Sequence, residues 1–187
     1  MPADVSGEHS YQFEHAKGVV RSTVGYIGGH KEHPAYEEVK AHTTGHAEAT
    51  LVEFDAEQTS FTELCKLFFE IHDPAQTDGQ GPDIGPQYRS EIFYLNDKQK
   101  EEAEAVIALL RGKGYEVNTK LTPATTFWEG EEYHQHYYDK TGGEPYCHIR
   151  VKKILTRSIS NKTYPNYKKD RTPKVSIKTF GVLCIKQ

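Results

Sequence analysis

The sequence predicts an α/β fold of the α+β kind, in which helices pack on one mixed β-sheet. Segments with the alternating apolar pattern of strands are separated by segments with the apolar period of helices. The length of 187 residues fits one domain with a core of ordinary size. A mean hydropathy of -0.74 is low for a compact domain, which indicates that part of the chain is polar and loosely packed.

The first predicted elements are recognised by the residues that end them. Residues 8–17 are predicted to form a helix because Gly18 follows as a stop signal. Residues 19–27 (VVRSTVGYI) are rich in β-branched side chains and end at a Gly-Gly pair, so they predict a strand. After a polar loop, residues 48–55 (EATLVEFD) alternate in polarity and predict a second strand.

The next segment predicts helix, strand and helix. Residues 60–73 carry a helical apolar stripe, and Ser60 with Glu63 at its start forms a capping-box pattern. A loop rich in glycine and proline leads to a strand at residues 88–95. Residues 97–113 are predicted to form a helix because a capping residue precedes them and glycines follow.

The last third is divided between the compact domain and a basic tail. Residues 115–128 contain a strand and room for a short second one, and residues 129–142 (EGEEYHQHYYDKTG) predict a helix. The compact domain is expected at residues 8–155. Residues 156–187 form an extension with eight Lys or Arg and one acid, whereas the rest of the chain has 15 basic and 26 acidic residues.

The order of these elements is that of a ferredoxin-like fold without its first strand. In that topology the first strand lies inside the sheet. If its place were empty, both neighbouring strands would expose unpaired backbone groups. Some other segment is therefore expected to replace the missing strand.

Cysteine usage and hydropathy predict a cytoplasmic protein. Cys65, Cys147 and Cys184 are odd in number and widely spaced, so they form neither a disulfide framework nor a zinc pattern. No apolar stretch reaches the roughly 20 residues of a membrane span, and no signal peptide is visible. The histidines are not spaced as metal ligands, so no metal is expected.

Phenols and carboxyls gather at predicted strand ends and in glycine-rich loops, where polar groups converge on pockets. They are Tyr26, Glu48, Asp83, Tyr88 and, directly before a cysteine, Tyr146. A carboxyl in a partly dry pocket can donate a proton near neutrality, and tyrosines can bind an oxygen. Such a site suits protonation of a leaving oxygen, although each tyrosine taken singly is also explained by packing.

Seven strings occur in order: VGYIGGH, YEEV, TGHAEA, HDPAQ, GPDIGPQYRS, EEYHQHY and PYCH. Over about residues 13–154 they resemble the methionine sulfoxide reductase A (MsrA) family. The resemblance implies a ferredoxin-like core and thiol-dependent reduction of methionine S-sulfoxide, free or in peptides, as repair after oxidative stress. It implies no bound cofactor and thioredoxin as the external reductant. Apart from the resemblance, the chain is expected to be a monomer with neither nucleic acid nor membrane as a partner.

The family's mechanism assigns roles to the quoted residues. A cysteine of low pKa attacks the sulfoxide sulfur, a glutamic acid protonates the oxygen, and the resulting sulfenic acid forms a disulfide with a second cysteine. The residues implied by the resemblance are the acid Glu48, the oxygen-binding Tyr26 and Tyr88, the pocket-ordering Asp83, the substrate-binding Tyr146, and Cys147 at the resolving position.

The chain departs from the family at the nucleophile. The family's cysteine lies in a Gly-Cys-Phe-Trp motif, which should fall near residues 5–7, and no Cys, Phe or Trp is present there. Three explanations are open. The chain starts late or is a degenerate copy that only binds methionine sulfoxide or a protein partner; Cys147 attacks directly; or the C-terminal tail supplies the nucleophile.

The third explanation depends on the end of the tail, KVSIKTFGVLCIKQ. This stretch has strand character, and its order Thr-Phe-Gly-x-x-Cys resembles the family's first strand running into its cysteine. The nineteen residues 156–174 can span roughly 60 Å when extended. The tail can therefore dock as the missing strand and bring Cys184 to the nucleophile's place; the alternative is an apolar tail that matches by coincidence.

Overall fold

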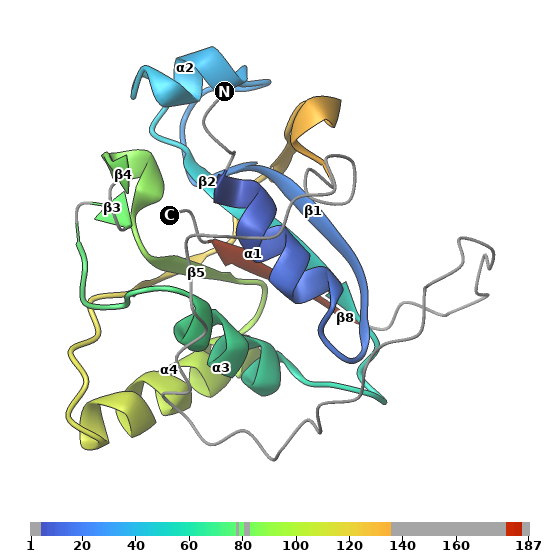
Figure 1. Ribbon diagram of the computed structural model, residues 1–187, viewed down its shortest axis with the longest axis vertical. Coiled ribbons are helices and arrows are strands. Elements are labelled where there is room, and N and C mark those ends of the chain that lie inside the picture. The colour runs from blue at the N-terminus through green and yellow to red at the C-terminus, as the bar shows by residue number, and fades with distance from the viewer. Residues whose placement is uncertain (1–4, 78, 81–82, 136–178, 185–187) are drawn as a thin grey trace.

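The computed structural model describes residues 5–77, 79–80, 83–135 and 179–184 (Figure 1). The helices are α1 (Val5–Glu14), α2 (Tyr36–Lys40), α3 (Phe61–Ile71) and α4 (Asp97–Gly112), with 3-10 turns η1 (Pro86–Tyr88) and η2 (Glu132–His134). The strands are β1 (Val19–Ile27), β2 (Ala47–Phe54), β3 (Gly79–Gln80), β4 (Asp83–Ile84), β5 (Glu91–Tyr94), β6 (Lys120–Pro123), β7 (Trp128–Glu129) and β8 (Thr179–Cys184).

The two longest helices begin at the caps that the sequence predicts. The Ser60 hydroxyl accepts the Glu63 N–H at 3.3 Å at the start of α3. The Asn96 side chain accepts the Gln99 N–H at 3.0 Å at the start of α4. Each bond satisfies a backbone donor that the first turn of a helix leaves open. The predicted starts of both helices are therefore confirmed.

A mixed six-stranded sheet forms the centre of the molecule, in the order β6-β5-β8-β2-β1-β7. β1 is antiparallel to β2, β8 is antiparallel to both β2 and β5, and β5 is parallel to β6. The order β8-α1-β1-β2-α3-β5 is the β-α-β-β-α-β order of a ferredoxin-like fold. The predicted fold class, a mixed sheet with helices packed on it, is confirmed.

The strand that opens this order comes from the C-terminal end of the chain. β8 lies between β2 and β5 and pairs with both (Figure 1). Leu183 pairs with Thr50 on one side and with Ile92 on the other. Residues 179–184, within the basic extension, thus provide the backbone partners that β2 and β5 would otherwise lack.

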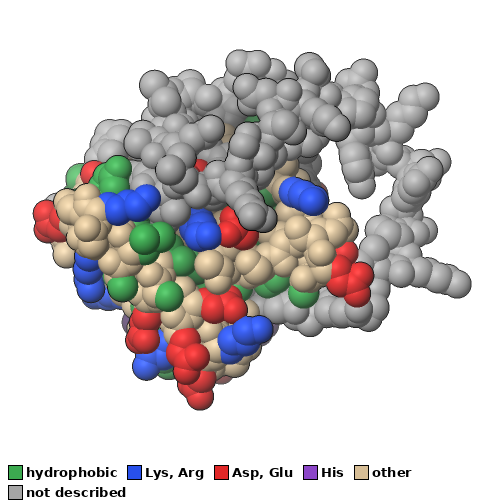
Figure 2. Space-filling view, turned by 90° about the horizontal axis from the view of Figure 1, so that it is seen from below, with side chains coloured by type: hydrophobic (Ala, Val, Ile, Leu, Met, Phe, Trp, Pro, Cys, Tyr) green, Lys and Arg blue, Asp and Glu red, His purple; other side chains and the backbone are tan. Residues whose placement is uncertain are grey.

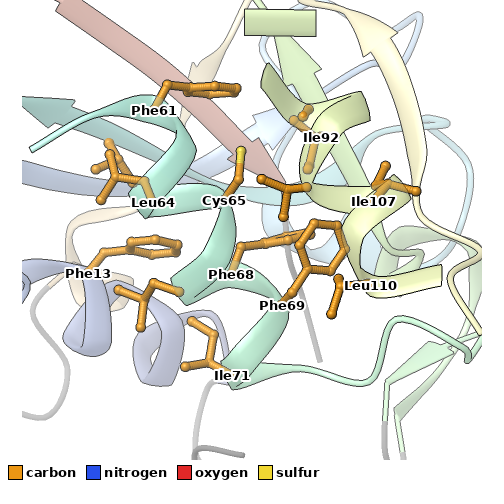
Figure 3. Close-up of a cluster of buried hydrophobic side chains, with 14 of the residues drawn as sticks. Phe13, Phe61, Leu64, Cys65, Phe68, Phe69, Ile71, Ile92, Ile107 and Leu110 are labelled. Atoms are coloured by element: carbon orange, nitrogen blue, oxygen red, sulfur yellow. The ribbon is translucent and has the colours of Figure 1, made fainter. Parts of the chain in front are cut away.

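Helices α1, α3 and α4 cover one face of the sheet, and the main core lies beneath them. Its buried side chains come from all three helices and from β2 and β5, with Phe68, Phe69 and Ile92 at 0% exposure. Figure 3 shows the side chains of α3 pointing into this cluster between α1 and α4. A smaller cluster of Ile27, Ala47, Ala49 and Phe93 lies apart from it.

Phe68→Ala is expected to lower the free energy of unfolding by about 3–5 kcal/mol, because it leaves a cavity in a closely packed core. The Phe68 ring is fully buried, and its centroid lies 5.0 Å from the centroid of the Phe69 ring in an edge-on arrangement. Urea unfolding measures the loss. Leu109→Ala on the outer side of α4, where Leu109 is 44% exposed, should change the stability by about 0.5 kcal/mol or less. Equal losses would contradict this description of the core.

Two expected segments differ from the structure. The polar loop after β1 contains α2, in which the Glu38 carboxylate accepts the Ala35 N–H at 3.0 Å and so starts a helical turn. The helix expected at residues 129–142 is instead the short turn η2 within the part that is described. The Gln135 amide there bonds to the backbone of Val24 in β1, which competes with continuation of a helix.

The outer surface mixes charged side chains of both signs. On the face shown in Figure 2, the hydrophobic side chains of the described residues appear as separate small groups between Lys, Arg, Asp and Glu. No helix in the described ranges has the length and apolar content needed to cross a membrane.

Candidate active site

Two predicted site residues, Tyr26 and Glu48, lie directly opposite each other on neighbouring strands. The register of β1 and β2 pairs Tyr26 with Glu48. Each residue is only 2% exposed. Side chains of opposite residues in an antiparallel pair lie on the same face, with Cβ atoms about 4.5–5.5 Å apart. A phenol and a carboxyl therefore share a site that is closed to bulk water.

The loop beyond this pair is held by His46 and depends on Gly29. The Gly29 N–H donates to His46 Nδ1 at 3.0 Å, so the proton of the neutral ring is on Nε2, which donates to the Lys31 carbonyl at 2.7 Å. A Cβ on Gly29 would lie 2.4 Å from both His46 N and Thr44 O. Only glycine fits here, and the loop brings the ends of β1 and β2 together beside Glu48.

The Tyr26 hydroxyl has a partner that the sequence did not predict. Tyr26 Oη donates to Glu131 Oε2 at 2.6 Å, and the Tyr36 N–H donates to Glu131 Oε1 at 2.8 Å. Burial, and then the neighbouring Glu131 carboxylate, raise the pKa of Tyr26 far above its ordinary value. Glu131 belongs to the EEYHQHY string, so a carboxylate next to a run of aromatic residues was the available signal.

Gln135 fixes the segment that carries Glu131 to the sheet. Its Oε1 accepts the Val24 N–H at 2.9 Å, and its Nε2 donates to the Val24 carbonyl at 2.8 Å. The same Nε2 also donates to the Gly130 carbonyl at 3.1 Å. These bonds satisfy both backbone groups of Val24, so η2 is held against β1 at the level of Tyr26.

Asp83 and Tyr88 belong to a second group of elements beside β2. Tyr88 is half-buried at the end of η1, which packs against both β2 and β3. Asp83 lies in β4, and its backbone pairs with Gln80 of β3. The Gln80 side chain in turn bonds to the backbone N–H and carbonyl of Asp73, which ties this hairpin to the end of α3.

The structure describes Cys65 and Cys184 but not Cys147. Cys65 lies in the main core at 0% exposure, among the side chains of Figure 3, and burial raises the pKa of its thiol well above the ordinary value. A thiol of that kind is inert. Cys147 and Tyr146 lie outside the described residues. Cys184 is the last residue of β8, and its backbone pairs with Glu91 of β5.

The register of β8 brings its end beside Glu48. Leu183 pairs with Thr50 of β2, and β8 is antiparallel to β2. Continuing this register by one residue sets Cys184 opposite Ala49, which is next to Glu48 in β2. Neighbouring strands are about 4.8 Å apart and rise about 3.4 Å per residue, which puts the two Cα atoms about 6 Å apart. Within the described residues, no cluster of His, Cys, Asp and Glu can hold a metal ion.

A family model, Peptide methionine sulfoxide reductase, matches residues 9–167. The chain belongs to the peptide methionine sulfoxide reductase family. Two relatives carry the name Peptide methionine sulfoxide reductase MsrA. The one from Acinetobacter baumannii (strain SDF) is 43% identical over 148 residues, which are 79% of this chain and 85% of the relative. The one from Geobacter sulfurreducens is 47% identical over 135 residues, 71% of this chain and 83% of the relative.

Solved structures of this reductase family share the fold. Mxr1 from Saccharomyces cerevisiae in reduced form has a TM-score of 0.72 at 30% identity, covering 79% of this chain and 88% of that chain. Methionine sulfoxide reductase A of Corynebacterium diphtheriae has a TM-score of 0.66 at 31% identity, covering 77% of this chain and 74% of that chain. The resemblance that the seven strings indicate is therefore confirmed.

Proposed function

We propose that this chain reduces methionine S-sulfoxide, free or in peptides, to methionine, with Cys184 as the attacking thiol and Glu48 as the proton donor. The observation that supports this most strongly is the position of β8. It lies between β2 and β5, and its last residue is close in register to Glu48. A reductase of this family needs a thiol at the end of that strand, and Cys184 is the cysteine that meets this need.

The direction of α1 also favours Cys184. α1 packs on β1 and β2, and Ser10 Oγ lies 3.0 Å from Ser22 Oγ. α1 and β1 run in opposite directions through the turn at Gly18, so the start of α1 points toward the end of β1 that carries Tyr26. β8 runs in the same direction as β1. The C-terminal end of β8 and the start of α1 thus lie at the same end of the sheet, the end that carries Tyr26 and Glu48.

The burial of Glu48 suits the role of an acid. A carboxyl removed from water favours its neutral form, which can donate a proton. In the proposed step, the Cys184 thiolate attacks the sulfoxide sulfur and Glu48 protonates the oxygen. The attack forms a bond between the two sulfurs. The protonated oxygen then passes to the Cys184 sulfur as a hydroxyl, while the sulfur–sulfur bond and the original sulfur–oxygen bond break, so the products are methionine and a sulfenic acid on Cys184. The sulfoxide is reduced by two electrons and the thiol is oxidised by two.

Recovery of the thiol needs a second thiol and an external reductant. Cys147 is proposed to attack the sulfenic acid, which releases water and forms a disulfide. An external dithiol, thioredoxin by analogy with the family, then reduces that disulfide, and no bound cofactor takes part. Asp83, Tyr88 and Tyr146 are proposed to line the substrate site, and the reductase domain is proposed to include β8 together with residues 8–155.

Stereospecific turnover tests this function. The full chain is incubated with dithiothreitol and either epimer of methionine sulfoxide, and methionine is measured over time. Methionine should form from the S-epimer and not from the R-epimer. Cys65→Ala is the matched control, because Cys65 is buried in the core away from Glu48, and it should keep the rate. No methionine from either epimer would contradict a reductase and favour a protein that only binds.

A further inference from the structure

Two consecutive residues directly after α3, His72 and Asp73, bind residues on either side of Tyr88 in the sequence. Before Tyr88, the Gln80 side chain accepts the Asp73 N–H at 3.1 Å and donates to the Asp73 carbonyl at 2.9 Å. After Tyr88, the Ser90 hydroxyl lies 2.8 Å from His72 Nε2. The stretch that carries Tyr88 is thus bound at both of its ends to the point where α3 stops.

The hydrogen bonds of the His72 ring have a fixed direction. His72 Nδ1 lies 2.6 Å from the Phe68 carbonyl, which can only accept, so Nδ1 carries a hydrogen. In the neutral ring Nε2 then has no hydrogen and accepts that of the Ser90 hydroxyl. The Ser90 oxygen lies 2.7 Å from Thr119 Oγ1, whose hydroxyl therefore donates to it. The bonds run from Thr119 through Ser90 and His72 to Phe68.

These bonds are closed off from water. His72, Ser90 and Thr119 are all buried. A buried polar group that loses its partner cannot bond to solvent instead, so these bonds cost more to break than bonds at the surface. The centroid of the His72 ring also lies 4.1 Å from that of the Phe68 ring, which holds the imidazole against the last turn of α3. His72 is therefore a fixed anchor for Ser90.

The backbone between Ser90 and Tyr88 is itself held in place. The Tyr88 N–H donates to the Gly85 carbonyl at 3.0 Å, which closes the turn η1. Arg89 is the residue between Tyr88 and Ser90, and its side chain donates to the Pro86 carbonyl at 2.9 Å. Because both bonds fix Tyr88 and Arg89 to the same turn, a displacement of Ser90 is passed on to Tyr88.

We propose that His72 is a positioning residue: by binding the Ser90 hydroxyl, it sets the place of Tyr88 against β2, the strand that carries Glu48. η1 packs against β2, so the two elements already meet. This role rests on the proposed function, in which Tyr88 lines the substrate site and Glu48 donates the proton. A sulfoxide that must reach both groups tolerates only a small error in their separation.

Ser90→Ala removes the bond to His72 and changes no charge. It should lower kcat/KM for methionine S-sulfoxide by about tenfold, because a small misplacement of Tyr88 weakens its contact with the substrate. A double-mutant cycle with Tyr88→Phe shows whether the loss acts through the phenol. In a chain that already lacks the Tyr88 hydroxyl, Ser90→Ala should cost less than about twofold more. Steady-state kinetics of the four chains with dithiothreitol measure this coupling.

Ser60→Ala is the matched control. It is the same substitution at the opposite end of α3, where it removes the bond from the Glu63 N–H. Loss of this cap should destabilise the chain, but kcat/KM should stay within about twofold of the wild type. Urea unfolding of both alanine variants separates general destabilisation from misplacement of Tyr88.

NMR supplies a readout that does not need activity. The full chain is labelled with ¹³C at the tyrosine Cζ carbon, and the Tyr88 signal is identified as the one missing from Tyr88→Phe. This signal should move in Ser90→Ala and keep its position in Ser60→Ala. ¹⁵N spectra of the histidine rings should show a hydrogen on His72 Nδ1, as the bond to the Phe68 carbonyl requires.

Each outcome decides the role of His72. If Ser90→Ala lowers kcat/KM by the same factor with and without the Tyr88 hydroxyl, the role is overturned, because the defect does not act through Tyr88. A Tyr88 signal that does not move in Ser90→Ala also overturns it, and so does a His72 ring without a hydrogen on Nδ1. If the wild type forms no methionine, the proposed function fails, while the Tyr88 signal still decides whether His72 positions the phenol.

Discussion

Cys184→Ser should abolish methionine formation from methionine S-sulfoxide while leaving the fold intact. A hydroxyl at this position cannot form the sulfenic acid, because serine is not oxidised by a sulfoxide. We expect a loss of at least about 1000-fold in the rate of a single turnover. Rapid mixing of excess protein with substrate, followed by quantification of methionine, measures it.

The other two cysteines serve as comparisons for Cys184→Ser. Cys65→Ala should keep the single-turnover rate, since Cys65 is fully buried among apolar side chains. Cys147→Ser should also release one methionine per chain, because the first oxygen transfer does not need the resolving thiol. Loss of the first turnover in Cys147→Ser together with its retention in Cys184→Ser would show that the nucleophile has been misassigned.

Glu48→Gln should lower kcat by about 100- to 1000-fold, with a much smaller effect on KM. Glutamine keeps the shape of the side chain but has no acidic proton, so the sulfoxide oxygen must leave unassisted. In the wild type the rate should fall as pH rises through the pKa of this acid, since the protonated form is the active one. The variant should lose that fall, which a pH profile of kcat/KM would detect.

Glu53→Gln is the control for Glu48→Gln. Glu53 lies on the same strand, where its backbone pairs with Arg21 and Phe180, and it is five residues away from the site. Removal of its charge should leave kcat within about twofold, as for surface substitutions away from the chemistry. If both variants lose activity equally, Glu48 is needed for the strand and not as an acid.

The elements with strong local signals were predictable from the sequence. The caps Ser60 and Asn96 fix the starts of α3 and α4 through contacts only three residues away. β1 follows from its β-branched residues and the glycines after it. The sequence predicted that Tyr26 and Glu48 belong to one site. That they lie directly opposite each other could not be predicted, because it depends on the register between β1 and β2.

The parts that depend on distant contacts were not predictable. Glu131 and Gln135 act on β1 through side chains more than 100 residues away in the chain, and no periodic pattern indicates this. They also hold the described part of the segment after β7 in the short turn η2, where a helix was expected. β8 was a weak signal, because six residues of strand character do not by themselves indicate which strands they pair with, so the tail was expected either to dock as the missing strand or to match by coincidence.

Identification of the oxidised cysteine decides whether β8 carries the nucleophile. Cys147→Ser protein is given one equivalent of methionine S-sulfoxide without reductant, and the sulfenic acid is trapped with dimedone and located by mass spectrometry. The label should be found on Cys184, with one methionine released per labelled chain and no label when the R-epimer is used. Methionine release with Cys184 unlabelled would contradict β8 as the strand that carries the nucleophile.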